Sequence, residues 1–454
     1  MIRSLTLIPA AAIILANIIG TGVFVKARVM TCNVGSPEMV LLVWFLAGLL
    51  TLCGALVYAE LGAMMPRSGG EFHFIGAAFG RRVAFIYGWT KTIALGASAA
   101  ALAIVLVMFL NDLLGGALPP LAVQLLPLLM IVVATGLNLR SAKSNGRTAT
   151  VLTAVKIALV LFVGLGAFLL ADGNWGNFSS GGETGVCEGV PESAKLGVSG
   201  FGAAMLGALW GYNGWAVIAA LGGEIKNPGR TIPRALIGGT LTVIALYLLV
   251  NLAYFYVLTP LEVASVAESS SVAGEAASRF FGPGAAALMS VGLMISAYGT
   301  LHTTLLTGPR IPFALARAGM LPAGLARISA QGVPAVAILT VGAWSIVLSV
   351  SGTFDILTDI YIFILWVFFG LSGAAVLVLR RTMPEIERPY RVWGYPVVPI
   401  LFLLVTVFLL VNTLLATPSR ALAGIVLIIA GLPVYEYFRR RAGEVTPPFW
   451  QRDD

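Results

Sequence analysis

Two short glycine-containing stretches carry residues that could bind a charged ligand inside otherwise apolar sequence. The first, IIGTGVF, runs from Ile18 to Phe24, and the second, WGYNGW, runs from Trp210 to Trp215. Each interrupts an apolar run that has the composition of a membrane helix. A broken helix leaves backbone C=O groups at the end of its first half and N–H groups at the start of its second half. Each stretch could therefore bind charge without a charged side chain.

The two kinds of exposed backbone group together predict the type of ligand. N–H groups at the positive end of a helix dipole bind a carboxylate, and C=O groups bind an ammonium group. An α-amino acid carries both groups on adjacent atoms, so it is the ligand expected for a pair of such breaks. The alternative is that the glycines only allow helices to approach closely. Two breaks in matching positions favour the binding site over this alternative.

Lys156 is the third candidate, because it lies deep inside an apolar run. It follows the start of that run by about ten residues, which is roughly 15 Å along a helix. A lysine at that depth is costly and indicates a function. Its ammonium could satisfy the carbonyls that a helix break exposes, whereas the alternative is a side chain that extends to the cytoplasmic face.

The composition indicates that these residues belong to a membrane protein made of helices. Of the 454 residues, 58% are hydrophobic and 11% are charged, and the mean hydropathy is +0.94. We predict about twelve spans from apolar runs of membrane-crossing length. The first run has no small-residue cleavage site, so we interpret it as a retained helix. The predicted spans are 5–28, 38–64, 79–113, 119–139, 146–170, 197–222, 232–257, 283–308, 333–351, 355–379, 397–416 and 420–438.

The positive charges fall mainly in one set of loops, which the positive-inside rule assigns to the cytoplasm. Both termini fall on this side, so the net charge of +8 indicates topology and not nucleic-acid binding. The sequence contains no P-loop, no catalytic constellation and no Cys/His cluster with metal-type spacing. The cytoplasmic set comprises Arg67, Arg81, Arg82, Arg140, Lys143, Arg147, Lys226, Arg230, Arg234, Arg310, Arg317, Arg327, Arg380, Arg381, Arg388 and Arg391; the opposite set comprises Lys26, Arg28, Lys195, Arg279 and Arg420.

The longest connection, 171–196, divides the spans into two groups of five. It is rich in Gly, Ser and Glu and is expected on the outer side. Since five is odd, a second group that repeats the first must be inverted, and both glycine breaks then fall in the first helix of their group. The predicted parts are a first repeat at 1–170, an extracellular loop at 171–196, a second repeat at 197–380, two further helices at 381–440 and a cytoplasmic tail at 441–454.

The three cysteines show no metal-type spacing. Cys53 lies within an apolar span, whereas Cys32 and Cys187 are both expected on the outer side. A disulfide between these two is one alternative, and the sequence favours the other, which is that they are unpaired.

Four longer segments carry a resemblance to a known family. They are NIIGTGVFVKA, YAELGAMMPRSGGEFHFIGAAFG, ALWGYNGWAVIAALGGEIKNPGRTIPRALI and LLTGPRIPFALARAGMLP. With them, nearly the whole chain resembles the amino acid–polyamine–organocation superfamily, and within it the bacterial relatives of the L-type amino acid transporters. The resemblance implies an all-α, LeuT-type fold with twelve transmembrane helices, formed by two inverted five-helix repeats plus two extra helices. It also implies alternating-access transport in a bacterial inner membrane, without a cofactor.

The resemblance assigns roles to residues at both breaks. In relatives the substrate carboxylate meets the first break, here Thr21 and Gly22 next to Gly20. The amino group meets carbonyls at Ile18 and at the second break. The residues of that second break are Trp210, Gly211 and Asn213, with Trp210 as a lid over the substrate. Lys156 resembles the lysine that replaces sodium in many relatives, with its ammonium between the first break and the eighth span.

The remaining candidates concern the substrate side chain and the gates. Asn213 is expected to face the substrate side chain, with helix capping as its alternative. No acidic residue lies near either break, so we predict neutral substrates of small to medium size. Tyr298 and His302 are candidates for lining the cavity, although a packing role is favoured for the histidine. Tyr361 is a weaker candidate for the outer gate. Lys91 is expected to act in structure or in the cytoplasmic gate, and Glu60 and Glu224 to pair with arginines.

The leading interpretation is a sodium-independent carrier that exchanges neutral amino acids across the lipid bilayer. The alternatives are a proton symporter that uses Lys156, a cationic amino acid or polyamine antiporter, and a sensor without flux. Mammalian L-type carriers join a glycoprotein heavy chain through a cysteine in the outer loop between the third and fourth helices. The corresponding NDLLGGALPP has no cysteine, so no such partner is expected.

Overall fold

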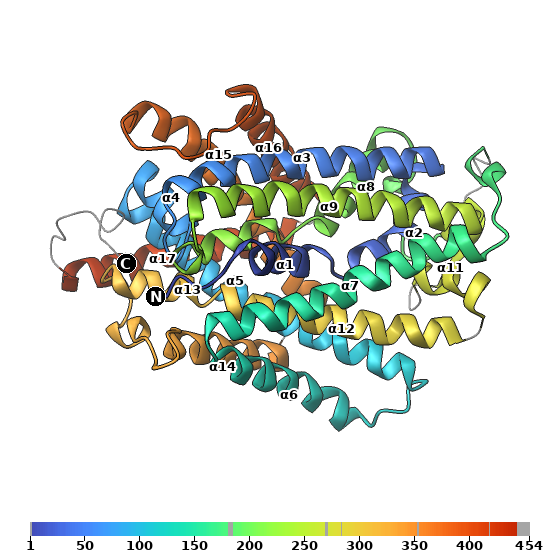
Figure 1. The fold of residues 1–454 in the computed structure, drawn as a ribbon, viewed down its shortest axis with the longest axis horizontal. Helices are drawn as coiled ribbons and strands as arrows, with labels where there is room; N and C mark the ends of the chain where they lie inside the picture. Colours follow the sequence, from blue (N-terminus) through green and yellow to red (C-terminus); the bar gives the residue numbers. More distant parts are fainter. Residues whose placement is uncertain are drawn as a thin grey trace.

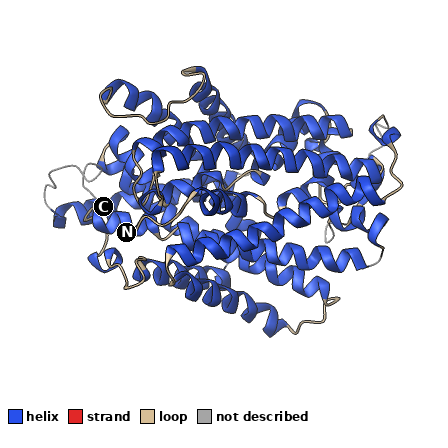
Figure 2. Cartoon of the chain, in the orientation of Figure 1, coloured by secondary structure: helices blue, strands red, loops and turns tan. Residues whose placement is uncertain are grey.

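A computed structural model describes residues 2–179, 185–267, 271–282, 284–351, 354–416 and 418–442. Helices form nearly all of the regular structure in these ranges (Figure 2). Two isolated backbone bridges join Leu5 to Ile225 and Ser68 to Leu221. The long helices run side by side along the long axis of the molecule (Figure 1). Of the predicted tail 441–454, all but the first two residues lie outside the described ranges.

The α-helices reproduce the predicted spans closely. Proline at the first helical position begins α3, α6 and α9, where its missing N–H costs nothing. The helices are α1 (Leu7–Ile18), α2 (Gly22–Val34), α3 (Pro37–Met64), α4 (Glu71–Phe79), α5 (Arg81–Leu113), α6 (Pro120–Asn138), α7 (Ala142–Leu170), α8 (Gly197–Gly211), α9 (Pro228–Val257), α10 (Pro260–Ser265), α11 (Val272–Phe281), α12 (Gly284–Thr307), α13 (Arg310–Arg317), α14 (Ala335–Ser351), α15 (Phe354–Thr382), α16 (Val397–Ala416) and α17 (Pro418–Ala442). Short 3₁₀ helices are η1 (Trp175–Phe178), η2 (Glu192–Ala194), η3 (Trp215–Ala220), η4 (Gly222–Glu224) and η5 (Ala323–Ala326).

Eight helices in the described ranges are long and apolar enough to cross a membrane alone, and the bent pair of α1 and α2 makes nine. The three other predicted spans coincide with α8 followed by η3, with α12 and with α14. The predicted all-α membrane fold is confirmed.

Both predicted breaks occur in the backbone. α1 and α2 are bent by 40° at the residues between Ile18 and Gly22. α8 ends at Gly211, and the chain continues as η3 from Trp215. Gly214, between the two, has φ 123°, a conformation that residues with a side chain rarely adopt. Glycine therefore permits the second break directly.

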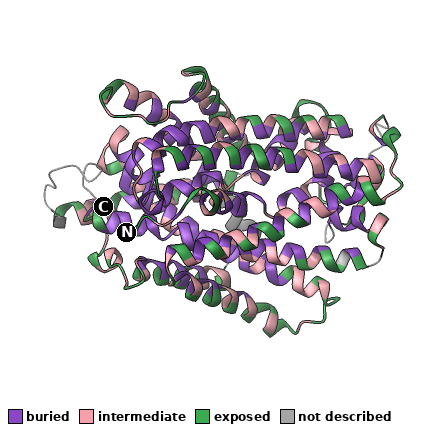
Figure 3. Ribbon diagram, viewed as in Figure 1, coloured by how far each residue is buried: buried purple, intermediate pink, exposed green. Residues whose placement is uncertain are grey.

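The interior of the bundle is formed jointly by helices from the two predicted halves. α1 lies centrally, in contact with α7 and α9, and α3 packs along α9 (Figure 1). Buried residues concentrate between the helices, and peripheral helices such as α6 carry exposed residues (Figure 3). Many of the exposed residues are large and apolar, for example Leu121, Leu125 and Leu129 of α6. An apolar outer surface over an apolar interior is what a lipid environment requires.

Two acidic side chains form the predicted pairs with arginines. Arg310 donates to Glu224 at 2.8 Å, and both side chains are fully buried. Arg380 donates to Glu60 at 2.6 Å, and Arg388 lies 3.4 Å from the same carboxylate. The prediction that these acids pair with nearby arginines is confirmed.

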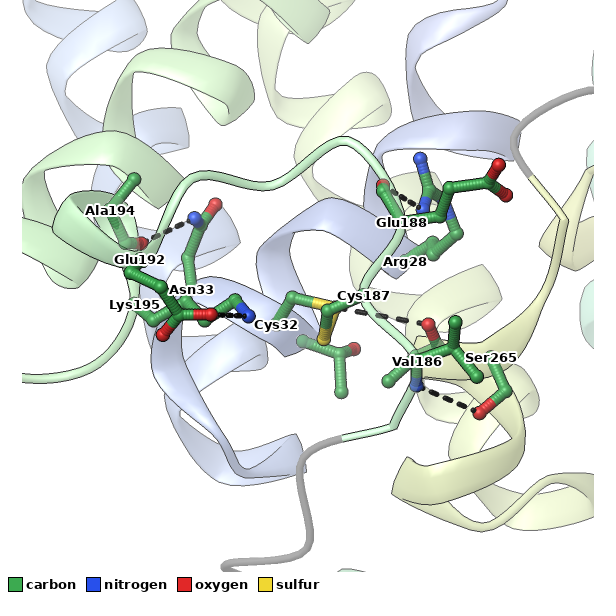
Figure 4. The surroundings of a disulfide bond; sticks show 12 residues. Arg28, Cys32, Asn33, Val186, Cys187, Glu188, Glu192, Ala194, Lys195 and Ser265 are labelled. Carbon is green, nitrogen blue, oxygen red and sulfur yellow. Dashed lines mark hydrogen bonds and ion pairs between the residues drawn. A yellow bond between two sulfur atoms is a disulfide. The ribbon is translucent and has the colours of Figure 1, made fainter.

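The outer loop is attached to α2 by a disulfide between Cys32 and Cys187 (Figure 4). The unpaired state that the sequence favoured for these cysteines is therefore wrong. Hydrogen bonds extend the attachment, because Arg28 donates to the Glu188 carbonyl at 2.7 Å and Asn33 donates to the Ala194 carbonyl at 2.6 Å (Figure 4). The loop from 185 to 196 is thus held against the outer half of the first broken span.

The disulfide should contribute to the stability of the folded chain. It links residues 155 positions apart, and removing such a link typically lowers the free energy of unfolding by about 2–4 kcal/mol. We expect the Cys32→Ser, Cys187→Ser double variant to unfold at a lower temperature than the wild type in detergent. Cys53→Ser is the control, since Cys53 is not disulfide-bonded. Equal unfolding temperatures of the double variant and the wild type under oxidising conditions would contradict the bond.

Candidate functional site

The two breaks meet at one central cavity. Residues from α5, α12 and α15 complete its wall. The lining residues are Asn17, Ile18, Gly20, Thr21, Gly22, Leu95, Ser98, Ala101, Leu102, Val105, Trp210, Gly211, Asn213, Gly214, Val217, Ala297, Thr300, Thr304, Thr307, Tyr361 and Ile362. Every predicted substrate-binding residue is in this set, and the set includes no acidic or basic side chain.

The first break presents the start of α2 to the cavity. The Thr21 side chain does not cap α2. The first N–H groups of a helix have no partner within the helix, so those at Gly22 and Val23 need an acceptor from elsewhere. Gly22 also brings the two breaks together, because a Cβ atom there would lie 3.0 Å from the Gly211 Cα and 3.1 Å from the Trp210 ring. This arrangement can bind a carboxylate.

The carbonyls at the two breaks share a hydrogen-bond donor that the sequence did not reveal. The Tyr247 hydroxyl, from α9, lies 2.8 Å from the Ile18 carbonyl oxygen and 3.0 Å from the Gly211 carbonyl oxygen. The Ile18 carbonyl also accepts from Gly20 N–H at 2.7 Å. The Trp210 carbonyl accepts from Asn213 N–H at 3.1 Å and is also the acceptor of Tyr212 N–H. Both breaks therefore present carbonyl oxygens that are already held in position by hydrogen bonds.

Lys156 reaches from α7 to both α1 and α12. Its ammonium donates to the Ala16 carbonyl at 2.6 Å and to the Thr300 hydroxyl at 2.8 Å. The residue is 1% exposed, so the alternative in which it extends to the cytoplasmic face is wrong. Lys156 is not among the lining residues, but its partner Thr300 is. Its ammonium meets α1 two residues before that helix ends, and it connects three helices beside the first break.

The side chains of Asn213 and Trp210 border the cavity from the second break. Among the described residues, no hydrogen bond joins the Asn213 side chain to backbone, and η3 has no side-chain cap. The capping alternative for Asn213 is therefore wrong. The Trp210 ring packs close to Gly22 of α2, and the Lys26 ammonium of the same helix lies 5.1 Å from the ring centroid. Tyr361 lines the cavity from α15.

Tyr298 and His302, the candidates for lining the cavity, are not among its described lining residues, and His302 has the packing role that was favoured for it. Tyr298 packs among apolar side chains of α5 and α6. His302 is fully buried, and Asn138 donates to its backbone carbonyl at 3.0 Å. The reason is the helical period, since Thr300, Thr304 and Thr307 form the face of α12 that meets the cavity.

Comparisons with known proteins show the family of the chain. The sequence profile of the amino acid permease family matches residues 5–433. The serine/threonine exchanger SteT of Bacillus subtilis is 31% identical over 444 residues, which cover 97% of each chain. The b(0,+)-type amino acid transporter 1 of Rattus norvegicus is 30% identical over 96% of this chain and 88% of its own length. The large neutral amino acids transporter small subunit 2 of Oryctolagus cuniculus is 29% identical over 95% of this chain and 80% of its own length.

Proposed function

The chain belongs to the amino acid permease family, and on this premise we propose that it exchanges neutral amino acids across a membrane without sodium. The observation that carries the proposal is the central cavity lined by both helix breaks. It offers the N–H groups of α2 to a carboxylate and the carbonyls of the second break to an ammonium group. A free α-amino acid matches both, and the relatives are exchangers or transporters of amino acids by name.

The absence of charged side chains from the described cavity wall supports neutral substrates. A substrate with a cationic or anionic side chain would lose its hydration there without gaining an ion pair. Asn213 supplies one polar group, and the threonines of α12 supply three more hydroxyls. We infer that small and medium neutral amino acids fit best, and serine and threonine are the first to test, as in the relative from Bacillus subtilis.

Sodium independence rests on Lys156. Its ammonium already supplies a positive charge to the Ala16 carbonyl and the Thr300 hydroxyl, between α1 and α12. Oxygen ligands of this type suit a small cation, so the ammonium takes the place that a sodium ion would need. We infer that the ion gradient does not drive this carrier and that a second amino acid does.

We further propose that the chain lies in a bacterial inner membrane with both termini in the cytoplasm. The positive loops support this orientation. We infer two inverted repeats, residues 1–170 and 197–380, whose broken first helices alternate access to the cavity. The loop between α5 and α6 contains no cysteine, which supports a carrier that works without a disulfide-linked heavy chain.

A competition panel tests the proposed substrate class. Vesicles that contain the purified protein are preloaded with unlabelled L-serine, and uptake of labelled L-serine is measured with neutral, cationic and anionic amino acids outside. We expect the neutral amino acids to compete and the charged ones to fail. Equal competition by lysine or glutamate would contradict the assignment.

Asn213→Asp should move the preference toward cationic substrates. A carboxylate beside the substrate side chain adds a charged interaction worth about 1.5–3 kcal/mol, so uptake of lysine relative to serine should rise about tenfold or more. The control is Asn111→Asp at the outer end of α5, where the side chain accepts from Leu118 N–H and a carboxylate can do the same. A preference that stays neutral in Asn213→Asp would show that this residue does not face the substrate side chain.

A further inference from the structure

A second cavity adjoins the central one and contains the charged groups that the central one lacks. Its lining includes Leu95, Asn213 and Tyr361, which also line the central cavity. Its charged lining side chains are Glu71 of α4 and Lys91 of α5. A substrate that leaves the central cavity past Asn213 and Tyr361 would enter this space.

The Glu71 carboxylate is held in a fixed position. It is 4% exposed, and its two oxygens accept from the hydroxyls of Tyr58 at 2.7 Å and Tyr87 at 2.6 Å. One tyrosine on each oxygen leaves further lone pairs on both. The carboxylate therefore has fixed geometry and unused capacity to accept hydrogen bonds.

The Lys91 ammonium is buried and lacks an anion among the described residues. It is 7% exposed, and its contacts are the rings of Tyr361, at 5.4 Å, and Phe369, at 6.0 Å. An ammonium has three N–H donors, and burial without an acceptor is costly. The aromatic faces offset part of this cost. A carboxylate from a ligand would offset much more.

The two charges face the same cavity without forming a direct ion pair with each other. Tyr87, which binds Glu71, precedes Lys91 by four residues on α5, so the two side chains are neighbours on one helix face. A ligand with a carboxylate next to an ammonium would fill the gap between them. We propose that this cavity is a second binding site for a free α-amino acid, with the carboxylate on Lys91 and the amino group on Glu71. The site rests on the proposed function and extends it.

The place of the second cavity in the fold indicates a role in transit. Glu71 lies in the short helix α4, and α5 begins with Arg81 and Arg82 in a loop assigned to the cytoplasm. The cavity therefore lies on the cytoplasmic side of the breaks. An amino acid bound there lies between the central cavity and the cytoplasm. The carrier therefore binds one substrate molecule in each of the two cavities along a single route.

The number of binding sites tests this proposal directly. The full chain in lipid nanodiscs is equilibrated with labelled L-serine, and bound molecules per chain are counted as the concentration rises. We expect two for the wild type. Lys91→Met should weaken the second site by about 30-fold or more, because truncating one member of a buried charge pair typically costs at least that much. Lys91→Arg should retain two sites, and so should the control Lys143→Met, which removes an exposed lysine from the start of α7.

The outcomes separate this site from the central one. Wild-type protein that exchanges serine but binds one molecule per chain would overturn the second site and leave the proposed function standing. Two bound serine molecules per chain in Lys91→Met would also overturn it, because the second molecule would then bind without the Lys91 ammonium. Protein that neither binds nor exchanges serine would overturn the proposed function itself. The count in the wild type needs no variant, so poor folding of Lys91→Met does not affect it.

Discussion

Amino acid exchange should fall about 100-fold in the Lys156→Met variant. The ammonium makes two hydrogen bonds, to the Ala16 carbonyl and the Thr300 hydroxyl, and bonds of a charged group typically contribute about 1.5–3 kcal/mol each. Methionine fills a similar volume but supplies neither donor nor charge. α7 then loses its charged hydrogen bonds to α1 and α12 beside the first break. The measurement is the initial rate of serine exchange in preloaded vesicles, normalised to the protein inserted.

Thr153→Val is the matched control for Lys156→Met. The Thr153 hydroxyl donates to the Ala12 carbonyl at 2.9 Å, so it joins α7 to α1 one turn away without a charge and without reaching α12. We expect a loss of less than about tenfold, since a neutral hydrogen bond contributes about 1 kcal/mol. Similar rates in Lys156→Met and the wild type would remove the lysine from the mechanism.

Gly214→Ala should also abolish most of the exchange. A Cβ atom at this position would lie 2.6 Å from the Asn17 carbonyl oxygen, and φ is 123°. Both conditions exclude a side chain, so the second break must move away from the first. A displacement of about 1 Å in a site that positions a ligand can cost about 100-fold. Serine exchange and serine binding should therefore fall together.

Gly202→Ala is the control within the same helix. A Cβ atom at Gly202 of α8 has no neighbour within 4 Å, and the substitution leaves the break unchanged. We expect normal exchange and a slight gain in stability, because alanine is favoured over glycine inside a helix by about 0.5–1 kcal/mol. Size-exclusion profiles of both variants identify any loss of folded protein. Normal exchange by folded Gly214→Ala would contradict the assigned geometry of the breaks.

The breaks and the spans could be predicted from sequence because each depends on local composition. Apolar runs set the helix lengths, and glycine marks the places where the helices stop. Lys156 could be predicted as a functional residue for a similar reason, since a lysine deep in an apolar run is costly and indicates a function. The pairs of Glu60 and Glu224 with arginines followed from their place near the charged helix ends.

What the sequence could not provide is the rotation of each helix about its axis. α9 carries three tyrosines, Tyr247, Tyr254 and Tyr256, and composition does not say which one reaches the breaks. The same uncertainty made Tyr298 a candidate for the cavity, although the cavity-facing residues of α12 lie on another face. The disulfide joins cysteines far apart in the chain, and only the folded outer loop brings them together.

Uptake into empty and preloaded vesicles tests most directly whether this chain is a sodium-independent exchanger. Labelled L-serine is offered in sodium-free buffer to vesicles that are empty or filled with unlabelled L-serine, with and without an inward proton gradient. We predict uptake into preloaded vesicles alone, unchanged by added sodium or by the proton gradient. Uptake into empty vesicles that follows either gradient would contradict this account and would make the carrier a symporter.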